Sequence, residues 1–313
     1  MRAKLPTMQV SRKPLFTFLG LVSVLAALSY AIAFSGDEGN VQGGLLLVQF
    51  APALSAIITK LIYQHNLRGL GWGWGKTRYQ VISYLLPFGL ALVSFGLVWL
   101  LGFGGFYNEA FVAEAQAGIA DMFGLNIASP YVTMLVLILV NGTVGLFVAF
   151  GAIGEEIGWR GFLVPELYKQ VDFTWTSIVS GLIWAVYHFP LLIVLYAPIR
   201  GISFWPLLLF ALIAGISLST ILAWLRIKSG SVWTAVIFHA SLNIHNQGFF
   251  QNLTTETSNL THYISGEHGL MLALVTAVVA FFFWRKRGSL PQAQVQAQPE
   301  LPKAIQPRIE IAS

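Results

Sequence analysis

Long apolar runs constrain this chain more than any other feature of its sequence. About eight such runs are present, close to the length that crosses a bilayer as a helix. They lie at about the following positions: 15–34, 44–63, 81–104, 131–153, 174–196, 206–225, 231–250 and 269–284. Because lipid offers the backbone no hydrogen bonds, runs of this kind fold as helices. The sequence therefore predicts an all-α fold, a polytopic bundle of transmembrane helices.

The charged residues fit this prediction. Only 10% of the residues are charged and 56% are hydrophobic, whereas a soluble domain carries about 25% charged residues. The net charge of +5 could indicate a nucleic-acid partner, but all 18 Lys and Arg residues except Arg200 fall in loops on one side of the predicted bundle. This is the positive-inside pattern, which places both termini in the cytoplasm and argues against nucleic acid.

The positions of the apolar runs and polar residues divide the chain into four segments. We expect three N-terminal spans with their loops, a core of spans four to seven, a last span and a disordered cytoplasmic tail rich in Gln, Pro and Ala. These parts are residues 1–130, 131–250, 251–287 and 288–313. The first run has an alternative interpretation as a cleaved secretory signal ending near Ala33. Cleavage there would leave the orientation of the later spans unchanged.

Two adjacent carboxylates and an arginine lie in the stretch "GAIGEEIGWRGFLVP" at the end of an apolar run. Charged residues in lipid are costly and mark functional sites by default. In an α-helix, Glu156 and Arg160 are four residues apart and can form an ion pair. Glu155 has no predicted partner in its own helix, so we expect it to point into the bundle. Alternatively, all three charges form a cluster that only ends the helix.

The same stretch carries a stripe of glycines. Gly154, Gly158 and Gly161 fall on one narrow face of a helix, where a neighbouring helix can approach closely. We expect this stripe to let the helices that bear His188 and His239 come close.

Two later spans carry polar side chains as well. His188 follows Trp184 by one helical turn in "GLIWAVYHFP". By itself, a histidine there is also compatible with a plain interhelical hydrogen bond. His239 and Asn243 are four residues apart in "VIFHASLNIHNQGFF", so they share one helix face and can aim at one ligand atom.

The residues that follow are assigned to the end of that helix. His245 falls about 120° away from His239 around the helix, so we leave it out of the site and place it near the membrane interface. Asn246 and Gln247 are expected to mark the fraying end.

Together, these side chains supply acid/base groups and hydrogen-bond donors from separate helices, which is typical of a hydrolase. A proton relay in a transporter and a non-catalytic scaffold or immunity protein remain alternatives. Glu155, His188 and His239 are also a set that can bind catalytic zinc.

The three motifs, Glu-Glu-x-x-x-Arg, aromatic-x-x-x-His and His-x-x-x-Asn, resemble those of the CPBP family of intramembrane proteases, which includes the type II CAAX prenyl endopeptidases. The resemblance covers roughly Val140 to Gly248. It implies an intramembrane endopeptidase in which Glu155 is the general base that activates water and His188 helps to hold that water. His239 and Asn243 would stabilise the oxyanion.

The resemblance also implies supporting roles for Glu156 and Arg160, which would orient these groups. Trp184 stands where the family usually has Phe, and we expect the change to affect packing only. No cofactor is required, with zinc as the open alternative. The implied partners are a membrane-embedded or lipid-anchored peptide or protein substrate and the lipid bilayer, with no nucleic acid. We expect a multi-pass protein of a prokaryotic plasma membrane.

Overall fold

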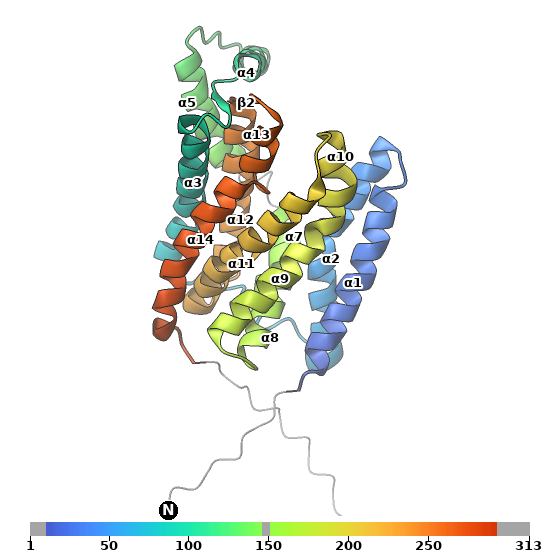
Figure 1. The fold of residues 1–313 in the computed structure, drawn as a ribbon. Helices are drawn as coiled ribbons and strands as arrows, with labels where there is room; N and C mark the ends of the chain where they lie inside the picture. Colours follow the sequence, from blue (N-terminus) through green and yellow to red (C-terminus); the bar gives the residue numbers. More distant parts are fainter. Residues whose placement is uncertain (1–10, 146–150, 293–313) are drawn as a thin grey trace, which may run out of the picture.

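The computed structural model describes residues 11–145 and 151–292, which are almost entirely helical (Figure 1). The elements are α1 (Lys13–Ala33), α2 (Glu38–Gln64), α3 (Thr77–Leu100), β1 (Gly105–Phe106), α4 (Glu109–Phe123), α5 (Pro130–Val140), η1 (Asn141–Gly145), α7 (Ala152–Glu156), η3 (Ile157–Leu163), α8 (Val164–Tyr168), α9 (Phe173–Leu191), η4 (Leu192–Tyr196), α10 (Ala197–Ile199), α11 (Phe204–Ser229), α12 (Trp233–Asn243), η5 (Ile244–Gln251), β2 (Thr254–Thr255), α13 (Asn259–Ile264), α14 (Leu270–Arg285) and η6 (Lys286–Ser289). The short strands β1 and β2 pair antiparallel. The predicted all-α polytopic bundle is confirmed.

Five of the described helices are long and apolar enough to cross a membrane. They are Lys13–Ala33, Glu38–Gln64, Thr77–Leu100, Phe173–Ile199 and Phe204–Ser229. The other three predicted spans coincide with the shorter helices α5, α12 and α14. The protein is therefore a multi-pass membrane protein, and the count of eight spans and the side of the termini stay predictions. Most of the predicted tail, residues 293–313, lies outside the described residues.

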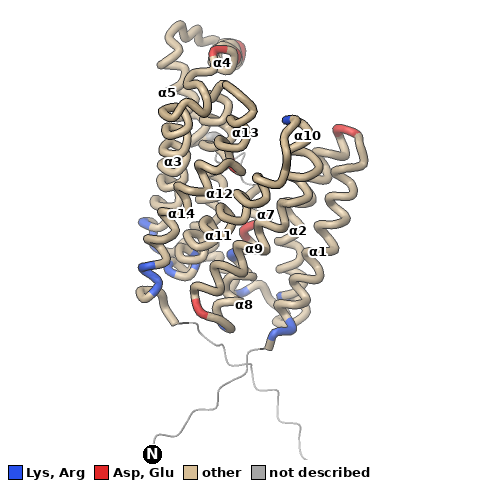
Figure 2. Tube along the Cα trace, viewed as in Figure 1, with Lys and Arg blue, Asp and Glu red and all other residues tan. Residues whose placement is uncertain are grey.

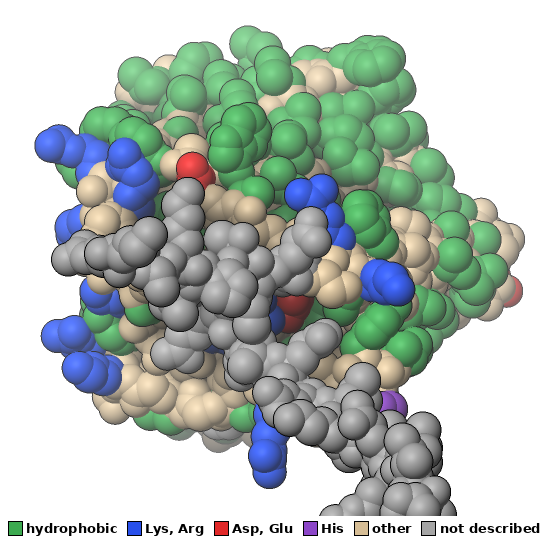
Figure 3. All heavy atoms as spheres, turned by 90° about the horizontal axis from the view of Figure 1, so that it is seen from below, with side chains coloured by type: hydrophobic (Ala, Val, Ile, Leu, Met, Phe, Trp, Pro, Cys, Tyr) green, Lys and Arg blue, Asp and Glu red, His purple; other side chains and the backbone are tan. Residues whose placement is uncertain are grey.

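The basic residues gather at one end of the bundle. Figure 2 shows Lys and Arg positions near α8 and the lower ends of α1 and α14, with one basic position at the opposite end beside α10. Figure 3 looks at the end where α8 lies and shows Lys and Arg side chains around it, with hydrophobic side chains over the flank. This separation agrees with the charge asymmetry on which the predicted orientation rests.

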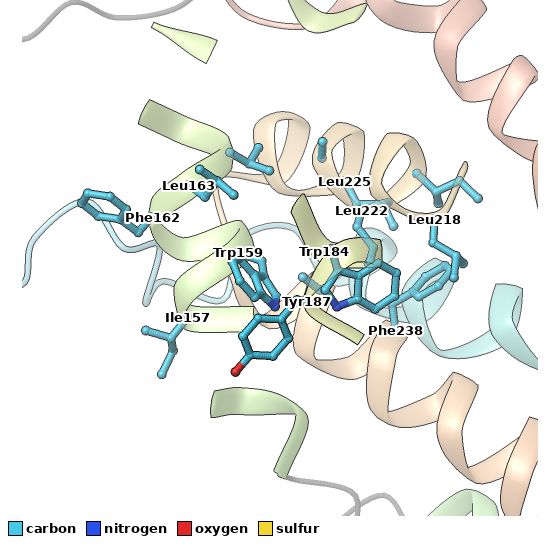
Figure 4. Packing of buried hydrophobic residues seen from close by; sticks show 14 of the residues in the cluster. Ile157, Trp159, Phe162, Leu163, Trp184, Tyr187, Leu218, Leu222, Leu225 and Phe238 are labelled. Carbon is cyan, nitrogen blue, oxygen red and sulfur yellow. The ribbon is translucent and has the colours of Figure 1, made fainter. Parts of the chain in front are cut away.

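The helices enclose a central group of short segments. α1 packs along α2, α11 lies between α9 and α14, α12 packs against α3, and α2 packs against α7. Figure 1 shows α7, α9, α11 and α12 between the α1–α2 pair and α3. The largest apolar cluster surrounds this centre and includes Trp159, Trp184 and Tyr187 (Figure 4). The polar side chains near α7 therefore lie within the packed interior.

The glycine stripe packs against α2. A Cβ atom added to Gly154 would lie 2.5 Å from the carbonyl oxygen of Gln49, and one added to Gly158 would overlap Pro52. The third glycine, Gly161, faces the loop that follows α2. The expectation that the stripe brings the two histidine-bearing helices together is therefore wrong. A stripe of small residues indicates that some backbone comes close, but it does not specify which helix supplies that backbone.

Replacing Gly158 with Ala is expected to lower the free energy of unfolding by about 1–3 kcal/mol, because the added methyl group overlaps Pro52. Thermal unfolding in detergent measures the loss. Gly96→Ala on α3 is the matched control, since nothing lies within 4 Å of its added Cβ. Equal stability of the Gly158→Ala protein and the unchanged protein would contradict the close contact with α2.

Candidate active site

The predicted polar side chains come from three helices that meet in the bundle. Glu155 and Glu156 end α7, His188 lies on α9, and His239 and Asn243 lie on α12. The helix predicted over 154–161 continues after α7 as the π-helix η3, a form often found at functional sites. Glu155 is 6% exposed and Glu156 is fully buried. Buried carboxylates need hydrogen-bond or charge partners, and the structure supplies them.

Two indole groups hold the Glu155 carboxylate. Its Oε2 accepts hydrogen bonds from Nε1 of Trp184 at 2.9 Å and from Nε1 of Trp159 at 3.2 Å. Its Oε1 receives no hydrogen bond from any described residue. The expectation that Glu155 has no partner in its own helical segment is wrong, because Trp159 follows it by four residues. That expectation considered only charged partners and overlooked the indole N–H donor.

His188 stands beside this carboxylate. Its Nε2 lies 3.8 Å from Oε2 of Glu155, and its Nδ1 lies 2.8 Å from the backbone carbonyl oxygen of Trp184. A carbonyl only accepts hydrogen bonds, so this contact needs the proton on Nδ1. In the neutral ring, Nε2 is then an acceptor that faces the Glu155 side of the site.

Trp184 links the separate parts of the site. Its ring packs edge-on against His188 and His239, at centroid distances of 5.4 and 5.8 Å. The Arg160 guanidinium carbon lies 4.9 Å from the ring centroid. A Phe ring could keep these packing contacts but could not donate to Glu155. The expectation that Trp at this position affects packing only is therefore wrong.

Replacing Trp184 with Phe is expected to lower kcat of the hydrolysis that the motifs predict by about tenfold, because Glu155 loses one of two charge-assisted hydrogen bonds and is held less firmly. Steady-state kinetics on purified protein measures the change. Trp175→Phe, an exposed tryptophan on the same helix, is the matched control and should leave kcat unchanged. An unchanged kcat in the Trp184→Phe protein would show that Trp159 alone suffices to hold the carboxylate.

A second buried group contains Glu156, Arg160 and His239. Nη1 of Arg160 lies 2.8 Å from Oε1 of Glu156, so the predicted ion pair is confirmed. The same oxygen lies 3.0 Å from Nδ1 of His239. Arg226 on α11 donates from Nε to the backbone carbonyl of Arg160 at 2.9 Å. Glu156 therefore joins the η3 segment to α12 and fixes the orientation of the His239 ring.

Asn243 contributes an amide group with unused hydrogen-bonding capacity. It lies one turn after His239 on the same helix. Its Oδ1 is buried and has no partner among the described residues. A buried polar atom without a partner indicates a position where a ligand or water completes the hydrogen bonds.

The residues after Asn243 differ from the prediction. The helix continues as η5 and does not fray there, and Asn246 is fully buried with both amide atoms unpaired among the described residues. His245 is also buried, with Nδ1 2.8 Å from the Ser241 carbonyl oxygen, and its placement near the membrane interface stays a prediction. One signal was available for Asn246: with His239 and Asn243 it forms an i, i+4, i+7 series, which lies on one helix face.

The predicted alternative of a zinc ion concerns Glu155, His188 and His239. Among the described residues, no group of three or more His, Cys, Asp or Glu side chains is placed to hold a metal ion. The protein contacts of Glu155 and His239 involve Oε2 and Nδ1, so Oε1 of Glu155 and Nε2 of His239 are the atoms that a ligand can reach. Catalytic zinc needs about three protein ligands at about 2.0–2.2 Å from the metal. In the present side-chain arrangement, Glu155, His188 and His239 do not form such a group, and zinc stays the alternative to a metal-free site.

Comparisons with known proteins agree with the three motifs. Residues 130–245 match the family model described as Type II CAAX prenyl endopeptidase Rce1-like. The chain is also 26% identical over 215 residues to CAAX prenyl protease 2 of Methanococcus maripaludis, an alignment that covers 66% of this chain and 68% of that protein. All of the predicted site residues fall inside the matched region. The resemblance to the CPBP proteases is therefore confirmed.

Proposed function

From the similarity of residues 130–245 to type II CAAX prenyl endopeptidases, we propose that this protein is an intramembrane endopeptidase in which Glu155 activates a water molecule. One observation carries the proposal. Two indole groups hold Oε2 of Glu155, while Oε1 is left without a protein donor in the described part of the chain. A general base needs this combination of a fixed orientation and an oxygen that can accept a proton.

The attacking water has two acceptors in this mechanism. Glu155 accepts one of its hydrogens and His188 Nε2 accepts the other, so the oxygen lone pair is directed at the substrate carbonyl carbon. As the new C–O bond forms, the proton moves to Glu155. Glu155 then returns it to the leaving amine as the C–N bond breaks, so that no external proton donor is consumed.

The developing negative charge on the carbonyl oxygen requires donors that are already in place. Asn243 can donate from its side-chain Nδ2. His239 can donate from Nε2 only when both ring nitrogens carry protons, since Nδ1 faces the Glu156 carboxylate. The negative charge of Glu156 would stabilise that cationic ring. Glu156 and Arg160 thus act as positioning residues for His239.

The proposed mechanism uses no metal step. We expect a chelator such as EDTA to change the cleavage rate by less than about twofold, since general-base chemistry requires no Lewis acid. The rate is measured after prolonged dialysis of the detergent-purified protein, with a known zinc peptidase treated in parallel as the control. A lost activity that returns with Zn²⁺ would support the zinc alternative.

The proposed substrate is a membrane-embedded or lipid-anchored peptide or protein, cleaved within a prokaryotic plasma membrane. The curated relative named above is archaeal and bears the name of a prenyl protease. The burial of Glu155 and His239 in the bundle favours a substrate that itself enters the membrane.

Mass spectrometry of protein termini tests the proposed function. Membranes are compared from cells that carry the unchanged protein or the Glu155→Ala variant at matched abundance. New N- and C-termini are expected only with the unchanged protein, and they would identify the substrate and its cleavage site. Identical termini in both samples, with the cellular phenotype kept by the variant, would favour the non-catalytic scaffold. Proton flux in proteoliposomes would favour the transporter.

A further inference from the structure

A cleft opens next to His188, on the side formed by α9, α11 and the loop between α13 and α14. It is lined by residues that include His188, Ala211, Ala214, Gly215, Glu267 and His268, and it is a shallow, partly open cleft with about 30 Å³ of accessible space. The floor on α11 consists of small and apolar side chains. The loop supplies two polar residues, Glu267 and His268, and neither belongs to the sequence motifs of the candidate active site.

The loop between α13 and α14 is shaped to bring these two residues to the cleft. Gly266 has a φ of +85°, a conformation that favours glycine. A Cβ added to Gly269 would overlap the backbone of Ser265. These two glycines flank Glu267 and His268 and permit a tight turn. The backbone conformation of this loop therefore fixes the position of Glu267 and His268.

Within residues 11–145 and 151–292, no Lys or Arg side chain is bound to the Glu267 carboxylate. Its partners are the side-chain amide of Gln247, which donates to Oε2, and His268, whose Nε2 lies 3.9 Å from the same oxygen. Among the described residues, no Lys or Arg forms an ion pair with it. Arg200 packs over the ring of Tyr196, 3.8 Å from its centroid.

His268 does not cancel this charge. Burial lowers the pKa of His268 below its ordinary value, and the neighbouring Glu267 charge opposes this only in part. His268 is therefore less easily protonated than an ordinary histidine, which limits how far it can offset the Glu267 charge. Tyr196 packs edge-on against it, at a centroid distance of 5.5 Å, and holds it at the cleft.

We propose that Glu267, with the small residues of α11, forms a binding subsite for a basic side chain of the peptide substrate. The methylene groups of a Lys or Arg side chain would lie on Ala211, Ala214 and Gly215, and the cationic end would meet Glu267. Such side chains commonly pack their apolar stem while the charged end finds a polar partner. This inference rests on the proposed peptidase function, because the bound side chain is taken to belong to the peptide substrate. The cleft adjoins His188, which places the subsite next to the proposed active site.

Binding measurements separate the subsite from the catalytic proposal. The probes are fluorescent farnesylated peptides ending in a CAAX box, in which one Lys is moved through the positions before the prenylated cysteine, each with a Gln-containing match. The full-length protein is used in detergent as its Glu155→Gln form, so that no peptide is cleaved. Fluorescence anisotropy then gives the Kd of each peptide.

At one position, the Lys peptide is expected to bind about tenfold more tightly than its Gln match, as for a well-formed charge pair. Adding Glu267→Gln should remove this preference, and adding Glu267→Lys should reverse it in favour of a Glu-containing peptide. Glu256→Gln is the matched control and should keep the preference, because Glu256 pairs with His262 at 3.2 Å outside the cleft.

The proposal is overturned if no Lys position is preferred, if no peptide binds, or if the preference survives Glu267→Gln. Glu267→Asp retains the charge and should retain part of the preference for Lys. This variant shows that a loss of preference in Glu267→Gln comes from the lost charge and not from misfolding. Cleavage of the same peptides by the protein with Glu155 intact is scored separately. Binding preference without cleavage rejects the peptidase function alone, and cleavage without preference rejects the subsite alone.

Discussion

Replacing Glu155 with Gln should lower kcat for peptide cleavage by about 100-fold to 10,000-fold, the range that a general base contributes. The amide has nearly the size of the carboxylate, and its oxygen can still accept from the indoles of Trp159 and Trp184. It cannot accept a proton from water. The rate is measured on a substrate identified by its new termini, and thermal unfolding checks that the variant is folded.

The matched control for this change is Glu166→Gln. Glu166 lies on α8 in the same helical segment and pairs with Lys169, outside the cluster around Glu155. Its replacement should leave kcat within about twofold, because it does not reach the reacting atoms. If Glu155→Gln retained more than a tenth of the activity, Glu155 would not be the base.

Replacing Arg160 with Leu should lower the free energy of unfolding by about 3–5 kcal/mol, because removing one partner leaves the other charge buried. Arg160 and Glu156 are both essentially inaccessible to solvent, at 1% and 0% exposed. Two of the Arg160 nitrogens, Nε and Nη2, have no partner among the described residues. The hydrogen bonds of the Arg160 guanidinium are therefore incompletely satisfied. The main cost of losing Arg160 is that the Glu156 carboxylate stays buried without its cationic partner.

A double-variant cycle tests this explanation. Combining Glu156→Gln with Arg160→Leu should recover part of the lost stability, since neither charge of the pair remains, but kcat should stay low because His239 loses its carboxylate partner. Thermal unfolding in detergent measures both proteins. Lys169→Leu removes the more accessible pair with Glu166 and should cost less than about 1 kcal/mol. Additive losses in the double variant would show that the two charges do not depend on each other.

Much of the fold and part of the site could be predicted from local patterns. Long apolar runs require helices in lipid, so all eight predicted segments contain helix. The Glu156–Arg160 pair followed from its i, i+4 spacing, because that spacing fixes the distance between two side chains within one helical segment. The same rule placed His239 and Asn243 one turn apart on α12.

Contacts between helices could not be predicted in this way, since they depend on how each helix is rotated and on which neighbour it meets. The glycine stripe predicted a close neighbour, but only the folded bundle shows that this neighbour is α2. The sequence indicates only a packing role for Trp184. In the folded bundle, its indole N–H donates to Glu155 on another helix. Glu267 lies 79 positions after His188 in the sequence and carries no motif, yet both line one cleft.

The sequence by itself determined that this chain forms membrane helices and which of its residues carry acid, base and donor groups, because both follow from composition and helical period. The tertiary structure decided which of these groups meet. Glu155 contacts Trp184 and His188, and Glu156 contacts His239. These contacts join separate helices, so they form only when each helix has the right rotation about its axis and the right position along it.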